Sequence, residues 1–375
     1  MKTPDKNTLC FFALLKAGLW EQGVRLSEYE GVDLAAVFRL GSEQSVVGLV
    51  TAGLELVQDV SIPRKDRLPF MQRVLVLEDR NSRMNAYIGD LLGRLRVEGI
   101  RPLLVKGQGI AQCYSRPQWR ASGDIDLLLQ DDGQYGHAKA LLLPKATRIQ
   151  QEYSSYKHAG MQVDGWEVEL HGSLRSRLSS RIDNYIDSVQ KDTFEKNHVR
   201  ILKIGDSQVE VPSPDNDVVF VFTHILHHFY IEGIGLRQIC DWCRLMWTFR
   251  DTLDVPLLQK RLEAMGLMSE WKAFAAYAVE WLGMPVEAMP LYSASKYWKR
   301  KAAYINGFVM KVGNFGHKRM AERGKKKRSY YIGKMCSLFS KAADYARHSV
   351  IFPLDSPRFF CHLLSDGIRA TKRGE

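Results

Sequence analysis

The stretch Val105–Leu129, VKGQGIAQCYSRPQWRASGDIDLLL, decides the fold of this chain of 375 residues. It begins at the end of a short apolar run, Ile100–Val105, which is typical of a buried strand. A glycine turn and a short helix follow at Lys106–Ser115, and Asp124–Leu129 is a second strand-like run. Further alternating runs come later in the chain. This order of strand, turn, helix and strand predicts an α+β fold with a mixed sheet and flanking helices.

Two carboxylates alternate at the start of the second run. Because side chains along a strand point to opposite faces in turn, Asp124 and Asp126 share one face, and Ile125 and Leu127 share the other. Two neighbouring carboxylates repel each other unless a cation neutralises them, and hard divalent cations prefer oxygen ligands. Gly123, just before the pair, permits close approach of a ligand to the backbone. The pair therefore predicts a metal site.

The glycine turn upstream predicts a phosphate site. Gly107 opens a short helix directly after a strand, where free N–H groups and the positive end of the helix dipole attract anions. Lys106 and Arg120 add positive charge, or are ordinary surface cations. Ser122 is expected either to contact phosphate or to stabilise the turn. A phosphate cradle beside an acid pair indicates nucleotide chemistry.

A third acid is expected from the run Trp166–His171, where Glu167, Glu169 and His171 share one face. Glu169 would meet Asp124 and Asp126 if the two strands are neighbours. Glu167 is the alternative.

Three motifs together carry a resemblance to a known family. Lys-Gly at 106–107, Arg-Ala-Ser-Gly-Asp-Ile-Asp at 120–126 and Glu-Leu-His at 169–171 resemble the nucleotidyltransferase superfamily with a DNA polymerase β-like palm. Within it, the chain resembles a bacterial subfamily of uncharacterised nucleotidyltransferases. The likeness is strongest over about residues 100–175 and weaker over 212–242 and 313–317.

The resemblance implies an activity. Asp124, Asp126 and Glu169 would bind Mg²⁺ or Mn²⁺, and a nucleoside monophosphate would pass from an NTP to a hydroxyl acceptor on a protein, a small molecule or RNA. One feature departs from the superfamily, which usually has Gly-Ser on the short helix before the acid pair. Here residues 106–109 are Lys-Gly-Gln-Gly, so the phosphate grip must differ. The rival hypothesis is a non-catalytic nucleotide-binding or scaffold protein, which acids held by internal Lys or Arg ion pairs would favour.

The rest of the chain is expected to be helical. Residues 1–98 form an N-terminal helical region that ends in a long amphipathic helix from Met71 to Val97. The nucleotidyltransferase core spans 99–212 and ends in a hairpin, and 213–375 form a C-terminal helical bundle.

The net charge of +11 belongs to one segment. Residues 296–334 contain 13 Lys/Arg and one acid, and the remainder has 40 basic and 41 acidic residues. Interleaved aromatic side chains make nucleic acid a possible partner of this segment. The alternative is that bases such as Lys299 pair with acids such as Glu280 within the bundle.

Two other patterns have the spacing of metal ligands, but their residues are expected to pack within helices and not to bind a metal. His224 and His228 have the i, i+4 spacing of a helical metal pair, but Ile225 replaces the HExxH glutamate. Cys240 and Cys243 lie within one predicted helix and have no second cysteine pair.

Six cysteines are too few for a disulfide scaffold, which indicates a reducing compartment. The charged start Met1–Asn7, and an apolar stretch broken by Lys16 and Glu21, do not fit a signal peptide. No run reaches the roughly 18 apolar residues of a membrane span. A cytoplasmic protein with no membrane span is expected.

Overall fold

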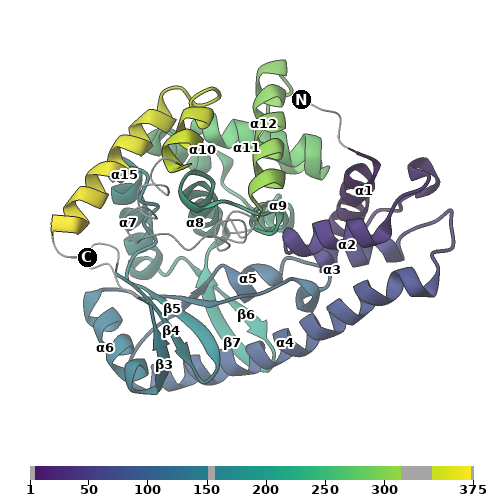
Figure 1. The fold of residues 1–375 in the computed structure, drawn as a ribbon. Coiled ribbons are helices and arrows are strands. Elements are labelled where there is room, and N and C mark those ends of the chain that lie inside the picture. Colours follow the sequence, from purple (N-terminus) through teal and green to yellow (C-terminus); the bar gives the residue numbers. More distant parts are fainter. Residues whose placement is uncertain (1–4, 151–156, 314–339, 373–375) are drawn as a thin grey trace, which may run out of the picture.

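The computed structural model describes residues 5–150, 157–313 and 340–372 (Figure 1). Residues 314–334 of the basic segment, with the four consecutive basic residues Lys325–Arg328, lie outside the described residues, as does Cys336. The sequence also predicts a strand over residues 147–156, and its end at 151–156 lies outside the described residues.

A five-stranded mixed sheet forms the centre of the fold, as predicted. The strand order is β1-β2-β5-β4-β3; β2 and β5 are parallel and every other neighbouring pair is antiparallel. The strands are β1 Leu103–Val105, β2 Ile125–Leu128, β3 Ala146–Ile149, β4 His158–Val163 and β5 Trp166–His171. The two expected hairpin strands are β6 Val199–Ile204 and β7 Ser207–Pro212, which form a separate two-stranded sheet.

Strand register brings the polar residues together on one face of the sheet. Asp126 on β2 lies directly beside Glu169 on β5, and His171 on β5 lies directly beside His158 on β4. Side chains two residues apart on a strand share a face, so all four face the same side.

The opposite face of the sheet is buried. Ile125, Leu127 and Val168 pack there in one apolar core with side chains of the long helix α4 Arg64–Val97 and of α6 Asp132–Leu142. In Figure 1, α4 runs along the base of the molecule beneath the strands. The apolar members of the alternating run thus anchor the sheet while the acids face the other way.

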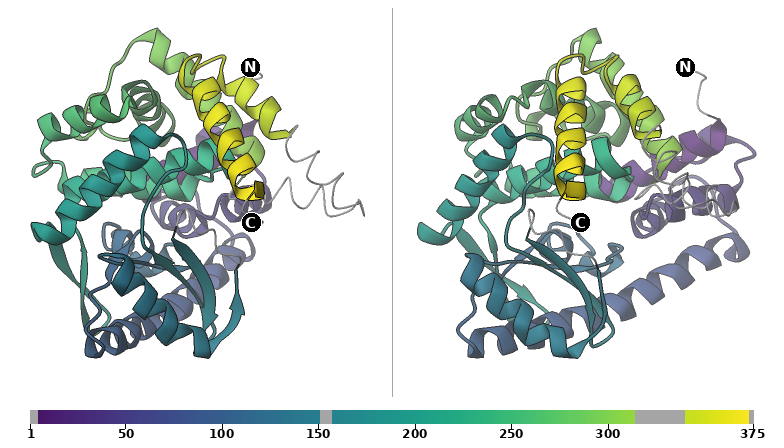
Figure 2. Two further views of the ribbon diagram at one scale, coloured as in Figure 1. Left: turned by 90° about the vertical axis from the view of Figure 1, so that its left-hand side faces the viewer. Right: turned by 60° about the vertical axis from the view of Figure 1, so that its left-hand side comes forward.

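A helical layer covers the polar side of the sheet (Figure 2). The N-terminal helices α1 Lys6–Trp20, α2 Leu34–Glu43 and α3 Val47–Glu55 share one apolar core with the C-terminal helices. Phe70 near the start of α4 joins this core, whereas the later part of α4, from Met84 to Leu95, packs under the sheet. The boundaries expected near residues 98 and 212 stay predictions. The other α-helices with described bounds are α5 Gly107–Ala111, α7 Ser180–Glu195, α8 Pro214–His227, α9 Leu236–Phe249, α10 Val255–Met265, α11 Met268–Leu282, α12 Lys296–Val312 and α15 Asp355–Lys372. Residues 340–348 are also helical.

Two helices differ from expectation. The long helix begins at Arg64 and not at Met71, and it keeps Pro69 inside it at the loss of one backbone hydrogen bond. Helix α7 was not predicted from the sequence. Its signals were the N-cap Ser179, whose hydroxyl accepts from the Ile182 N–H, and the buried helical series Ile182, Ile186 and Val189.

Helices α1 and α3 cross at a pair of glycines. A Cβ built on Gly18 would meet the Leu49 carbonyl oxygen, and one built on Gly53 would meet the Leu14 carbonyl oxygen. Backbone atoms cannot move aside as flexible side chains do, so neither position accommodates a methyl group.

We predict that Gly18→Ala lowers the free energy of unfolding by about 2 kcal/mol or more, because the added methyl group forces the two helices apart. Gly93→Ala on α4 is the matched control, since Gly93 is exposed and its Cβ would meet no atom within 4 Å. That change should be neutral or stabilise by about 0.5–1 kcal/mol. Urea unfolding curves measure both, and equal effects would contradict the close crossing.

Candidate active site

The acids open into a pocket of about 390 Å³ between the polar face of the sheet and the helices above it. Asp124, Asp126 and Glu169 line one side, together with Lys106 and Gly107. The other walls include Arg177, His224, His227, His228, Glu232, Arg237 and Asp241. The pocket therefore joins acidic, basic and imidazole groups in one concavity.

Asp126 is the buried centre of this charge cluster. Its Oδ1 accepts a hydrogen bond from Lys106 Nζ at 2.9 Å and lies 2.7 Å from His171 Nε2. Burial alone would raise the pKa of Asp126, but Lys106 and His171 hold it well below its ordinary value. The carboxylate is thus ionised and already has a cationic partner.

Asp124 is half-buried beside it and differs in environment. Among the residues that the structure describes, none makes a hydrogen bond or ion pair with its carboxylate. Burial first, and then the charges of Asp126 and Glu169, raise the pKa of Asp124 to about 6. An acid in this state gains from an added cation.

Glu169 completes the set of acids. Its Oε2 lies 3.0 Å from His158 Nε2 and 3.7 Å from His171 Nε2. Burial would raise its pKa, but the hydrogen bond with His158 lowers it below the ordinary value. Glu167, the alternative third acid, instead lies 4.0 Å from Arg148 and does not line the described pocket.

A strained turn aims Lys106 at the acids. Lys106 has a φ of +57° and Gly107 a φ of +36°, a region that residues other than glycine seldom adopt. Although burial acts to lower the Lys106 pKa, Asp126 and Glu169 raise it, so the amine stays charged. Helix α5 begins at Gly107, inside the expected glycine turn, and is five residues long.

Asn81 of α4 fastens the loop that precedes the acid pair. Its Nδ2 donates to the carbonyls of Gln118 at 2.6 Å and Arg120 at 2.8 Å, and its Oδ1 accepts from Gln108 Nε2 at 2.8 Å and from the Ser122 hydroxyl. Ser122 therefore turns toward α4. Neither Ser122 nor Gly123 is among the described residues that line the pocket.

Arg120 holds the same loop from the other side. Its Nε and Nη2 donate to Asp241 of α9 at 2.8 and 2.7 Å, and the Tyr114 hydroxyl donates to the same carboxylate at 2.7 Å. Arg237 of α9 donates to the carbonyl of Ala121 at 2.9 Å. Arg120 lines the pocket, but two of its nitrogens are committed to Asp241, a partner that the sequence analysis did not find.

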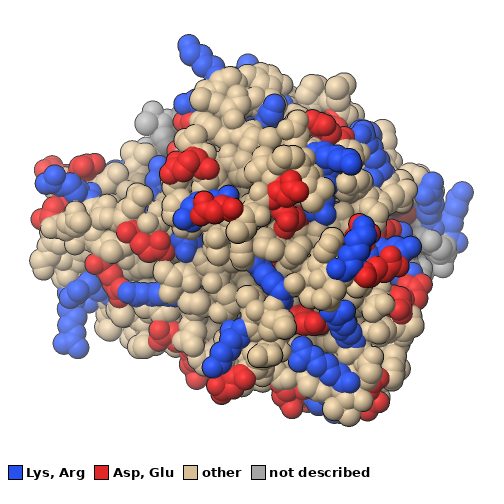
Figure 3. Space-filling view, turned by 180° about the vertical axis from the view of Figure 1, so that it is seen from behind, with Lys and Arg blue, Asp and Glu red and all other residues tan. Residues whose placement is uncertain are grey.

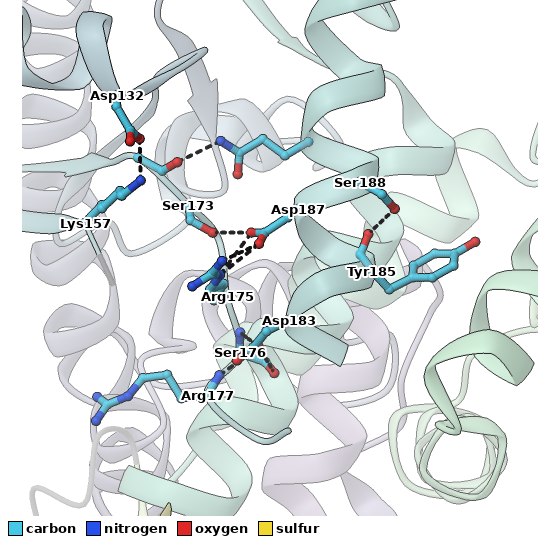
Figure 4. A network of polar contacts seen from close by, with 12 residues as sticks. Asp132, Lys157, Ser173, Arg175, Ser176, Arg177, Asp183, Tyr185, Asp187 and Ser188 are labelled. Carbon is cyan, nitrogen blue, oxygen red and sulfur yellow. Dashed lines mark hydrogen bonds and ion pairs between the residues drawn. The ribbon is translucent and has the colours of Figure 1, made fainter. Parts of the chain in front are cut away.

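The rim of the pocket is a loop fixed by α7 (Figure 4). Asp183 accepts from the backbone N–H groups of Ser176 at 2.8 Å and Arg177 at 3.1 Å, and Asp187 pairs with Arg175 at 2.6 Å. The strand β5 that bears Glu169 runs directly into this loop, so α7 positions the end of the strand.

The histidines at the end of α8 and just after it contact one another. His228 Nε2 lies 3.0 Å from His224 Nε2, and Glu232 Oε2 lies 3.0 Å from His228 Nδ1. Burial and the charge of Lys106 lower the pKa of His224 well below its ordinary value. Cys240 and Cys243 are free and buried within α9, where burial raises both pKa values.

The described part of the basic segment, α12, has bases committed to the helical core. Lys299 pairs with Glu280 at 2.8 Å, as the bundle alternative expected, and buried Lys301 lies over the rings of Tyr297 and Trp298. On the face opposite that of Figure 1, basic and acidic side chains are interspersed (Figure 3).

Comparison with known proteins identifies the family. The model of the family described as "Uncharacterised nucleotidyltransferase" matches residues 30–283, about two thirds of the chain. The chain belongs to this nucleotidyltransferase family. The match takes in all three acids, Lys106 and Asp241, so the pocket lies within the part that the family shares.

A solved structure of an antigenic nucleotidyltransferase-like protein from Paracoccidioides brasiliensis is similar at 15% identity, covering 56% of this chain and 93% of that one. Its TM-score of 0.31 is too low to bear on the fold. No curated protein gives a significant match. Among the described residues of this nucleotidyltransferase-family chain, no helix has the length and apolarity to cross a membrane.

We predict that Asn81→Ala lowers the free energy of unfolding by about 2–3 kcal/mol, because it removes the hydrogen-bond donor to the buried carbonyl of Arg120 and the part-buried bond to the carbonyl of Gln118. Ser82→Ala is the matched control on the exposed side of α4 and should change stability little. Thermal and urea unfolding measure both variants. Similar stabilities of the two would contradict the role of Asn81.

Asp124→Asn should stabilise the metal-free protein at pH 7.5. The Asp124 pKa is about 6 in the folded chain, above its unfolded value near 3.9, so the folded state loses stability as pH rises through this window. The asparagine amide does not ionise, so the variant does not lose this stability. We expect its free energy of unfolding at pH 7.5 to exceed that of the wild type by about 1–2 kcal/mol, and this difference should disappear below about pH 4. Urea unfolding in chelator at both pH values measures it; a less stable variant at pH 7.5 would refute the repulsion.

Proposed function

We propose that this protein transfers a nucleoside monophosphate from an NTP to a hydroxyl acceptor in a reaction dependent on Mg²⁺ or Mn²⁺. The main support is that Asp124, Asp126 and Glu169 line one pocket beside Lys106. Membership of a nucleotidyltransferase family supports the reaction class.

The donor set fits a divalent cation. Three carboxylates face one space, and burial together with the charges of Asp126 and Glu169 raises the pKa of Asp124, so an added cation would stabilise its ionised form. Asp124, Asp126 and Glu169 would hold the metal, which when bound would neutralise the phosphates and lower the pKa of the attacking hydroxyl.

The chain's own groups supply the rest of the chemistry. Lys106 and the backbone at Gly107 would bind the β- and γ-phosphates, because the ammonium is charged and glycine leaves room for the phosphate beside the backbone. The acceptor oxygen forms a bond to the α-phosphorus as the bond to the bridging oxygen breaks, and pyrophosphate leaves. Glu169 would take the hydroxyl proton. Fixed charges and positioning lower the barrier, without a covalent enzyme intermediate.

The acceptor is proposed to be a hydroxyl on a small molecule, a protein or RNA. The pocket of about 390 Å³ has polar walls beyond the acids, among them Arg177 and the histidines of α8, which would contact it. If the acceptor is RNA, the basic segment 296–334 would contact the nucleic acid.

A second candidate is favoured by one specific contact. Lys106 and His171 both contact the Asp126 carboxylate, and residues 106–109 lack the superfamily serine. A lysine ammonium in this position does what a metal ion would do. The second candidate is therefore a nucleotide-binding or scaffold protein in which the ion pair has replaced the metal.

The transfer reaction is tested with ATP, CTP, GTP and UTP labelled at the α-phosphate, each with Mg²⁺ or Mn²⁺, purified protein and cell extract as the acceptor source. We expect transfer of label from one or more NTPs. Glu169→Gln should lower it by about 100-fold or more, since the metal supplies several kcal/mol of transition-state stabilisation. Glu167→Gln is the matched control and should retain activity; equal losses would contradict the assignment of Glu169.

Lys106→Met separates the two candidate functions. If Lys106 binds the triphosphate, the variant loses nucleotide affinity and transfer by about 10-fold or more, because a charge-assisted contact to phosphate is lost. If Lys106 has replaced the metal, the variant instead gains Mg²⁺ affinity and the wild type shows no transfer. Calorimetric titrations with Mg²⁺ and with each NTP distinguish these results.

A further inference from the structure

Two imidazoles and a carboxylate meet at one side of the pocket. His158 and His171 lie directly opposite each other on β4 and β5, and their rings stack with centroids 4.7 Å apart. Glu169, two residues before His171, faces the same side. One ligand atom from each of the three residues lies within 4.8 Å of the other two.

The spacing of these atoms suits direct coordination. Ligands about 2.0–2.1 Å from a tetrahedral ion lie roughly 3.3 Å from one another. Glu169 Oε2 lies 3.0 Å from His158 Nε2 and 3.7 Å from His171 Nε2, values on either side of that distance. Asp126 Oδ1 lies 2.7 Å from His171 Nε2, so it adjoins this group at His171.

The kind of donor selects the kind of metal. Mg²⁺ demands oxygen ligands in near-octahedral geometry, whereas imidazole nitrogen suits Zn²⁺ and neighbouring transition ions. Two histidines and one carboxylate with an open position form a donor set that binds zinc in proteins. An oxygen-only site would leave His158 and His171 without a metal-binding role.

We propose that His158, Glu169 and His171 form a binding site for a divalent transition ion of the Zn²⁺ type, next to the oxygen ligands Asp124 and Asp126. This proposal refines the proposed function. The two are linked only through Glu169, which is a proposed metal ligand in both. Metal binding at this site does not require that the protein transfer nucleotides.

The neighbouring histidine group is a different arrangement. His227 Nδ1 lies 2.8 Å from the Ser176 carbonyl oxygen, and Glu232 contacts both His227 and His228. Among the described residues, no three ligand atoms of this group all lie within 4.8 Å of one another, so this group serves as an internal comparison for the experiment.

The test uses the full chain without an affinity tag, freed of metal by chelation, and titrates it with Zn²⁺ against a competing chelator. We expect one Zn²⁺ per chain, unaffected by millimolar Mg²⁺. Co²⁺ should give the strong visible absorption of a low-coordinate site. His158→Ala and Glu169→Gln should each weaken Zn²⁺ binding by about 100-fold or more, because losses of outer partners alone reach 10–100-fold.

Matched variants locate the site. His137→Ala removes an exposed histidine of α6 and should bind Zn²⁺ as the wild type does, and so should His224→Ala. Undiminished Zn²⁺ binding by His158→Ala, or loss in His224→Ala alone, would overturn the proposal, as would a wild type that takes up no Zn²⁺.

Asp124→Asn separates this proposal from the proposed function. Asp124 is a proposed ligand of the metal used in nucleotide transfer, but it is not a ligand of the proposed Zn²⁺ site. This variant should therefore lose transfer activity and retain Zn²⁺ binding. A wild type that binds Zn²⁺ without transferring label leaves the metal site standing and removes the transfer reaction. A wild type that transfers label but takes up no Zn²⁺ supports the transfer reaction and removes the Zn²⁺ site.

Discussion

Asp126 and Glu169 lie side by side on the parallel strands β2 and β5, and the rest of the pocket follows from that register. A shift of one residue on either strand would turn one of these acids into the apolar core and bring a leucine or valine into the pocket. Two ionised carboxylates at this spacing, with Asp124 beside them, need compensating charge. The Lys106 ammonium supplies it in the structure, His158 and His171 lie within hydrogen-bonding distance of the acids, and a divalent cation is the proposed alternative partner.

Features that stabilise the fold surround a site that weakens it. The turn at Lys106 and Gly107 is strained, and the pKa of Asp124 is raised by burial and by repulsion from Asp126 and Glu169. The buried hydrogen bonds of Asn81 and the ion pair between Arg120 and Asp241 hold the loop that presents the acids. Rigid support of this kind is what a catalytic or binding site needs in order to keep its charges in place.

The sequence predicted the local parts of this arrangement well. The predicted run Trp166–His171 has the bounds of β5. Alternation placed Glu169 and His171 on one face of that strand, and Asp124 and Asp126 on one face of theirs, because side-chain direction depends only on period. Long-range partners were beyond it. Asn81 contacts Gln108 across 27 residues, and Asp241 contacts Arg120 across 121, and no periodicity encodes such pairs. Ser122 shows the consequence: it was considered for phosphate but bonds Asn81. Helix α7 was missed although its cap and apolar series were present.

A crystal structure of the protein with Mn²⁺ and a non-hydrolysable NTP tests the central claim most directly, because manganese is located by its anomalous scattering. We predict an anomalous peak coordinated by Asp124 and Asp126. We also predict that the triphosphate lies against Gly107 and that Lys106 has turned from Asp126 to a phosphate oxygen. An intact Lys106–Asp126 ion pair, with no peak at the acids and no ordered nucleotide, would contradict it.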